Sequence, residues 1–162
     1  MQDYVIDLRE TVERAAPLLL TLSDDESKKP CSPDKWSPRE IIGHLIDSAS
    51  NNHQRFVRAQ FQNDLVFPGY AQEDWVRVQG YRDAPWKELV TLWHSYNLQL
   101  ARVMAAAPEN VRLKEHRKHN LHQIGWRIIP EGEGATLDYL MSDYVGHLKS
   151  HLQQILGNDW EL

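Results

Sequence analysis

The sequence predicts an all-α protein whose core is a bundle of four helices. Four segments carry apolar residues at alternating steps of three and four, the spacing of one face of an α-helix. The stretches between them do not alternate apolar and polar residues for long enough to build a sheet, and the one strand-like piece, 124–129, is short. Four amphipathic helices bury their apolar faces most simply against one another, so a four-helix bundle is expected.

The first helix is expected over 5–22, where six apolar residues share one face. The second helix has the clearest start in the chain, because Ser37 is a good N-cap and Glu40, three residues later, completes a capping box. The proline after the cap takes the first helical position, where its missing N–H costs nothing. Trp36, ahead of the cap, can pack on Ile41 as a hydrophobic staple.

Apolar spacing also places the third helix over 85–107 and the last over 136–157. Pro108 stops the third helix. The last helix has a threonine as its N-cap and a glycine at its end. The connections after the second and third helices, 61–84 and 108–135, are longer than usual bundle loops, and connections of that length often carry function.

Length and charge narrow the class of protein. A chain of 162 residues can bury a substantial core, and we expect a single domain over 1–162. The net charge of −5 argues against a nucleic-acid binder, and no apolar run approaches the roughly 20 residues that cross a bilayer. Leu18–Leu20 is too short for a signal-peptide core. Cys31 is the single cysteine and is expected to be an incidental thiol, so a cytoplasmic location is expected. From the charge and the lack of a long apolar run, we expect no nucleic-acid or membrane partner.

Three histidines lie at the edges of apolar stripes on two of the expected helices. His147 and His151 are four residues apart and therefore share a face of the last helix. His44 lies on the second helix, about 60° from Ile41. A bundle could bring the three imidazoles together around one divalent ion. The spacing alone is weak evidence, because eight histidines in 162 residues produce such pairs by chance, and half-buried histidines bonded to their neighbours are the alternative.

The remaining histidines are expected to have structural or surface roles. His53 lies toward the apolar side of the second helix and should pack in the core, whereas His94 should lie at the surface. His116, His119 and His122 repeat every third residue in a basic loop, a period that suits neither a helix face nor a strand. We expect a solvated loop or a dimer contact there rather than a second metal site, although these histidines could line the mouth of a pocket.

Several fragments occur in an order and spacing that together match a known family. They are WSPREIIGHL at 36–45, YAQEDW at 70–75, TLDYL at 136–140, and His147 and His151 followed by Gln154 and Ile155. In these fragments the chain resembles the DinB-like family, also called the YfiT-like metal-dependent hydrolases, which is distinct from the DNA polymerase of the same name. The resemblance covers most of the chain.

The resemblance implies an up-and-down four-helix bundle, often a homodimer, with one divalent ion held by His44, His147 and His151. It implies a metal-dependent hydrolase or a thiol S-transferase that acts on a small molecule or uses a small thiol. The alternative is a non-catalytic metal-binding or ligand-sensing bundle. Many relatives have a second histidine directly beside the last ligand, whereas Ser150 occupies that position here, which changes the surroundings of the ion but not its ligands.

Three histidine ligands leave coordination positions open, which suits a catalytic site. Because imidazoles are neutral, the ion keeps its full charge and acidifies a water or thiol bound to it. Zinc or nickel is expected, with iron or manganese as alternatives, since the ligand type does not choose among them. No catalytic base is assigned. Asp143, one turn before His147, could orient an imidazole or act as a base, or be an ordinary solvated residue; further candidates for orienting the histidines are Asp47, Ser48 and Asn51.

Overall fold

The computed structural model describes residues 2–30, 32–158 and 160, and within these residues it contains helices and no strand. The long helices are α1 (Asp3–Leu19), α3 (Pro38–Arg58), α5 (Trp86–Ala106) and α8 (Leu137–Leu156). The prediction of an all-α four-helix bundle with long connections after its second and third helices is confirmed. Cys31, predicted to be an incidental thiol, lies outside the described residues.

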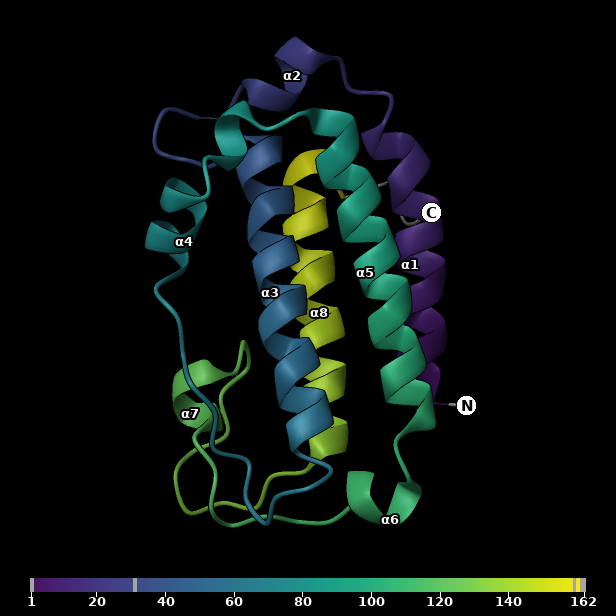
Figure 1. Cartoon of the computed structure of the whole chain (residues 1–162), viewed down its shortest axis with the longest axis vertical. Helices are drawn as coiled ribbons and strands as arrows, with labels where there is room; N and C mark the ends of the chain where they lie inside the picture. The colour runs from purple at the N-terminus through teal and green to yellow at the C-terminus, as the bar shows by residue number, and fades with distance from the viewer. Residues whose placement is uncertain (1, 31, 159, 161–162) are drawn as a thin grey trace.

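The long helices run up, down, down and up in chain order (Figure 1), so the alternating up-and-down order that the family resemblance implied is wrong. Each of α1 and α3 packs against both α5 and α8. The neighbours α3 and α5 are parallel because the chain returns along the outside of α3 before α5 begins (Figure 1). The neighbours α3 and α8 are antiparallel, so the first half of α3 lies beside the second half of α8.

Local signals account for where the long helices begin and which face they bury. Ser37 and Glu40 form the predicted capping box at the start of α3, and Thr136 accepts a hydrogen bond from the backbone N–H of Tyr139 at the start of α8. On α1 the residues at the predicted spacing are completely buried: Val5, Leu8, Val12, Ala15 and Leu19. They belong to one apolar cluster to which all four long helices contribute.

The connections contain short helices that the sequence did not predict. They are α2 (Asp24–Lys28), α4 (Gln72–Val78), η1 (Tyr81–Asp83), α6 (Glu109–Arg112) and α7 (Leu121–Ile124). None exceeds 7 residues, which is too short for apolar periodicity to appear. The segments that carry α4 and α7 both pass along the α3 side of the bundle (Figure 1). The strand-like stretch 124–129 is the end of α7 followed by irregular chain.

The histidine-rich loop is held in place rather than solvated, so the prediction of a solvated loop is wrong for its first two histidines. The backbone of His116 exchanges hydrogen bonds of 2.8 and 3.0 Å with Ala135, and its Nδ1 lies 3.1 Å from the carbonyl oxygen of Asn63. His119 Nε2 lies 2.9 Å from the carbonyl oxygen of Glu133. Both rings are buried. A ring nitrogen that faces a carbonyl oxygen carries a proton, so these nitrogens cannot serve as metal ligands.

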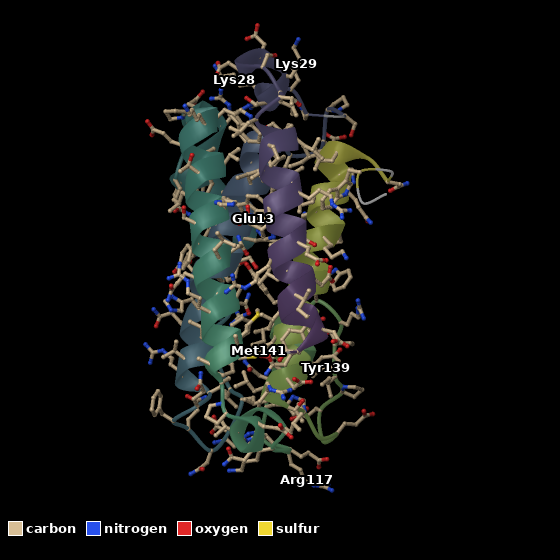
Figure 2. The ribbon with its side chains drawn as sticks, turned by 90° about the vertical axis from the view of Figure 1, so that its right-hand side faces the viewer. Glu13, Lys28, Lys29, Arg117, Tyr139 and Met141 are labelled. Atoms are coloured by element: carbon tan, nitrogen blue, oxygen red, sulfur yellow. The ribbon has the colours of Figure 1, made fainter. Side chains whose placement is uncertain are left out.

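His53 and His94 lie at contacts between helices. His53 is half-buried, with Nδ1 3.4 Å from the hydroxyl of Tyr96, so it lies at the rim of the core rather than inside it. His94 on α5 lies 3.4 Å from the carboxylate of Glu13, on the face where α1 and α5 run side by side (Figure 2).

In the described part of the chain, no helix combines the length and apolar content that a bilayer span requires.

Candidate metal centre

The antiparallel pair α3 and α8 brings three histidines together. His44 comes from the buried face of α3, and His147 and His151 come from successive turns of α8. The Nε2 atoms of His44 and His147 are 3.3 Å apart. One ring nitrogen from each of the three lies within 4.8 Å of the others. The sequence prediction that these imidazoles converge is therefore met by the geometry.

One distance within the cluster and the protonation state of its three rings fit a divalent ion. Two nitrogen ligands about 2.0–2.1 Å from a tetrahedral ion are separated by about 3.3 Å, which is the distance between His44 and His147. Burial lowers the pKa of His44 to about 4 and that of His147 to about 3, and it also lowers the pKa of His151. All three rings are thus uncharged at neutral pH, the form that binds metal ions.

Trp36 forms a wall of the cluster. Its ring centroid lies 5.0 Å from that of His44 and 6.5 Å from that of His151. The sequence assigned Trp36 only to a staple with Ile41 and missed this contact. The spacing of eight residues between Trp36 and His44, close to two helical turns, is a signal that could have indicated it.

The residues predicted to orient the imidazoles are engaged elsewhere. Asp47 Oδ1 accepts hydrogen bonds from the hydroxyl of Tyr81 and the side-chain amide of Gln79, at 2.7 and 2.8 Å. Ser48 accepts a hydrogen bond from Asn52, and Asn51 donates to a backbone carbonyl. His44 on α3 and His151 on α8 each have a buried Nδ1 atom. Neither atom has a hydrogen-bond partner in the part of the chain that the structure describes. Burial and ring packing therefore hold the ring of His44, and the side chain of Gln154 also hydrogen-bonds that of His151.

Asp143 is buried and fastens the second long connection. Its two carboxylate oxygens accept hydrogen bonds of 2.8 Å from the backbone N–H groups of Trp126 and Arg127. Burial raises the pKa of this carboxyl group. The expectation of a solvated residue is wrong, because both carboxylate oxygens of Asp143 bind the connection rather than His147. Its position on α8 instead fixes the chain after α7 against the bundle.

A cavity of about 370 Å³ extends from the histidines between the bundle and the two long connections. Such a volume suits a small molecule. His44 and His147 belong to its lining, together with residues of both connections: Gly69, Tyr70, Gln72, Gln123, Ile124, Gly125 and Trp126. Burial raises the pKa of Tyr70 to about 12, so its hydroxyl is neutral at physiological pH. The histidine cluster is therefore flanked by Trp36 on one side and open to the cavity at His44 and His147.

The fold and the site define a helical-bundle protein with a histidine cluster on the wall of a cavity. The sequence model that defines the DinB superfamily matches residues 7–155, and the chain belongs to this superfamily. It is similar to a protein of Oceanobacillus iheyensis named "Putative metal-dependent hydrolase OB0413", with 24% identity over 160 residues that make up 98% of this chain and 84% of the relative.

A solved structure with the same fold is YfiT from Bacillus subtilis, described as "a probable metal-dependent hydrolase with an unusual four-helix bundle topology". The two structures superpose with a TM-score of 0.77 at 16% sequence identity. The match covers 96% of this chain and 86% of YfiT. At that identity the likeness concerns the fold.

Proposed function

We propose that this protein is a metal-dependent enzyme in which His44, His147 and His151 hold one divalent ion. The observation that carries the proposal is the convergence of three uncharged imidazoles, with two ring nitrogens 3.3 Å apart, beside a cavity large enough for a small molecule. The relative from Oceanobacillus iheyensis, whose name includes metal-dependent hydrolase, supports it. Zinc or nickel is the expected ion, with iron or manganese as alternatives, because imidazole ligands alone do not identify the metal.

A divalent ion held by three neutral ligands would lower the pKa of a water or thiol beside it and so supply a nucleophile near neutral pH. The protein itself would contribute in three further ways. Burial keeps the imidazoles unprotonated, the indole of Trp36 excludes water from one side, and the cavity admits the substrate from the other. The reaction class is hydrolysis of a small molecule or transfer of a thiol to an electrophilic one.

The test is elemental analysis of the purified protein together with thermal melts of the chelator-treated and metal-reloaded forms. We expect about one ion per chain and a higher melting temperature with metal, because a ligand of the folded state alone stabilises it. His151→Ala should abolish metal binding, and the matched control His94→Ala should retain it. A metal-to-chain ratio near zero after growth in metal-replete medium, with identical melts, contradicts the proposal.

Turnover separates an enzyme from a metal-binding or ligand-sensing bundle. The metal-loaded protein should cleave ester or amide substrates, or transfer a small thiol, and His151→Ala should remove that activity while the chain stays folded. Binding of an ion without turnover of either class would favour the non-catalytic alternative. The family resemblance also supports a homodimer, which light scattering should report as twice the 18.9 kDa chain mass, and the single cysteine favours the cytoplasm.

A further inference from the structure

The cavity beside the histidines contains a buried cation that has no acidic partner among the described residues. Arg55 on α3 is 6% exposed and lines the cavity. Its Nη2 donates a hydrogen bond to the carbonyl oxygen of Pro68 at 3.1 Å, and its Nη1 lies 3.4 Å from Oδ1 of Asn52. A guanidinium group has five N–H donors, and these two acceptors engage only two of them. Among the described residues, no carboxylate lies within ion-pair distance of Arg55.

A second buried arginine, Arg39, has a structural role and differs from Arg55 in having an acidic partner. Arg39 on α3 is 1% exposed, and it binds the carboxylate of Asp24, the hydroxyl of Ser27 and the carbonyl oxygen of Ala84. A buried charge without a partner is costly. Arg39 avoids that cost through its acidic partner, whereas Arg55 faces a cavity.

Arg55 lies at a useful distance from the histidine cluster. It follows His44 by 11 residues on the same helix, which corresponds to about three turns and about 16 Å of helix axis. Side chains on a helix lean toward its N-terminus, and the contact with Asn52, three residues earlier, has that direction. The guanidinium therefore reaches back along the cavity toward the histidines. Tyr70 lines the same stretch; burial raises its pKa to about 12, and the nearby Arg55 charge offsets part of that rise.

We propose that Arg55 binds an oxyanion of the substrate, a carboxylate or a phosphate, at the end of the cavity away from the histidines. An oxyanion would neutralise the buried charge and accept two charge-assisted hydrogen bonds from the planar guanidinium. The inference rests on the proposed function, because the reacting end of the same molecule would lie at the histidine cluster. The substrate class is thus an elongated small molecule with a reactive centre at one end and an acidic group at the other.

The first experiment requires neither a metal nor a variant. Metal-free protein is titrated with octanoate, octyl phosphate and octanol, and binding is followed by tryptophan fluorescence, since Trp126 lines the cavity. We expect one or both anions to bind roughly tenfold more tightly than the alcohol, in keeping with a charge-assisted hydrogen bond, and the better of the two identifies the oxyanion. Equal affinity for all three ligands would overturn the proposal.

The second experiment uses ligands that would bind the metal ion and Arg55 at the same time. Cobalt-loaded protein is titrated without oxygen with ω-mercapto acids and matched ω-mercapto alcohols of increasing chain length, and the thiolate-to-cobalt absorption band reports binding. The acid should bind roughly tenfold more tightly than its alcohol at one intermediate length. If no chain length shows that preference, the anion site is contradicted but the metal site is not. If the protein does not bind cobalt, the proposed function is contradicted, and the metal-free titration still tests the anion site.

Matched variants separate binding from a structural role. Arg55→Gln keeps a donor for the carbonyl oxygen of Pro68 but loses the charge, so the preference for anions should vanish. Arg55→Lys should retain part of it. Arg58→Gln, an exposed position on the same helix, should leave it unchanged. A preference that survives in Arg55→Gln, or that disappears equally in Arg58→Gln, contradicts the proposal.

Discussion

The indole ring of Trp36 lies against the imidazole of His44, with 5.0 Å between the ring centroids and 41° between the ring planes. The same indole approaches His151 to 6.5 Å. A single side chain at the start of α3 thus contacts ring systems from both helices that build the candidate metal centre. It lies close enough to serve as an optical probe of that centre.

A paramagnetic ion in the cluster should quench the fluorescence of Trp36. In Trp36→Phe the quenching caused by Co²⁺ or Ni²⁺ should fall sharply, because the nearest fluorophore is gone while an aromatic wall remains. Trp75→Phe, on the short helix α4 and 37% exposed, is the matched control and should quench as wild type does. The measurement is a fluorescence titration of each protein with the ion. Equal quenching in Trp36→Phe and wild type would place the ion elsewhere.

Replacing Asp143 with asparagine should loosen the chain after α7. An amide can accept at its oxygen but presents a donor where the second carboxylate oxygen was, so one of the N–H groups of Trp126 and Arg127 loses its partner. The free energy of unfolding should drop by about 1–3 kcal/mol, and hydrogen exchange at 125–129 should accelerate. Urea denaturation and exchange mass spectrometry check both effects. Asp74→Asn removes only an exposed ion pair with Arg77 and should change stability very little.

Acid should destabilise the metal-free protein through the histidine cluster. The pKa of His44 is about 4 and that of His147 about 3 in the folded state, against 6.5 as the ordinary value. Below pH 6.5 the unfolded chain therefore binds more protons than the folded one. The free energy of unfolding should fall as the pH drops from 6.5 to 5, with a limiting slope of about 1.4 kcal/mol per pH unit for each histidine, and this contribution should be constant above pH 7.

Urea denaturation of metal-free protein between pH 5 and 8 measures this dependence. His147→Asn removes one of the buried imidazoles, so its stability should vary less steeply with pH than that of wild type. A wild-type profile that is flat between pH 5 and 7 would contradict the prediction.

Gly43 leaves room for the ring of Tyr81, and a side chain there should destabilise the fold. A Cβ atom at Gly43 would lie 2.2 Å from two ring atoms of Tyr81, whose hydroxyl donates to Asp47. Gly43→Ala should therefore cost about 1–3 kcal/mol of unfolding free energy, the usual penalty of overpacking. At Gly69 the nearest neighbour of a new Cβ lies at 3.8 Å, so Gly69→Ala is the control. Identical denaturation midpoints for the two variants would refute the steric argument.

The long helices and the shared face of His147 and His151 could be predicted because their signals are local or periodic, whereas the approach of His44 to that pair was implied by the family resemblance. The capping box of Ser37 and Glu40 lies within four residues, and the position of His147 and His151 on one face follows from helical geometry. The direction of α5 could not be predicted in this way. It depends on the route of the 59–85 connection, whose short helices are too brief for periodicity to reveal.

The errors concern side chains whose partners are distant in sequence. His116 and His119 contact the carbonyl oxygens of Asn63 and Glu133, and a spacing of three gives no hint of either. Asp143 binds a connection 16 and 17 residues away, so its own helix could not show whether it was solvated. Such contacts depend on how loops fold over the bundle.

His44 and His147 approach one another although 103 residues separate them in the chain. An ion shared by them would act as a removable cross-link, closing a loop for which a chain-entropy model gives about 4.7 kcal/mol at a comparable length. Unlike a bond between cysteines, this link tolerates a reducing environment and depends on metal supply. Metal starvation would then expose the chain to proteolysis and lower its cellular abundance as well as its activity.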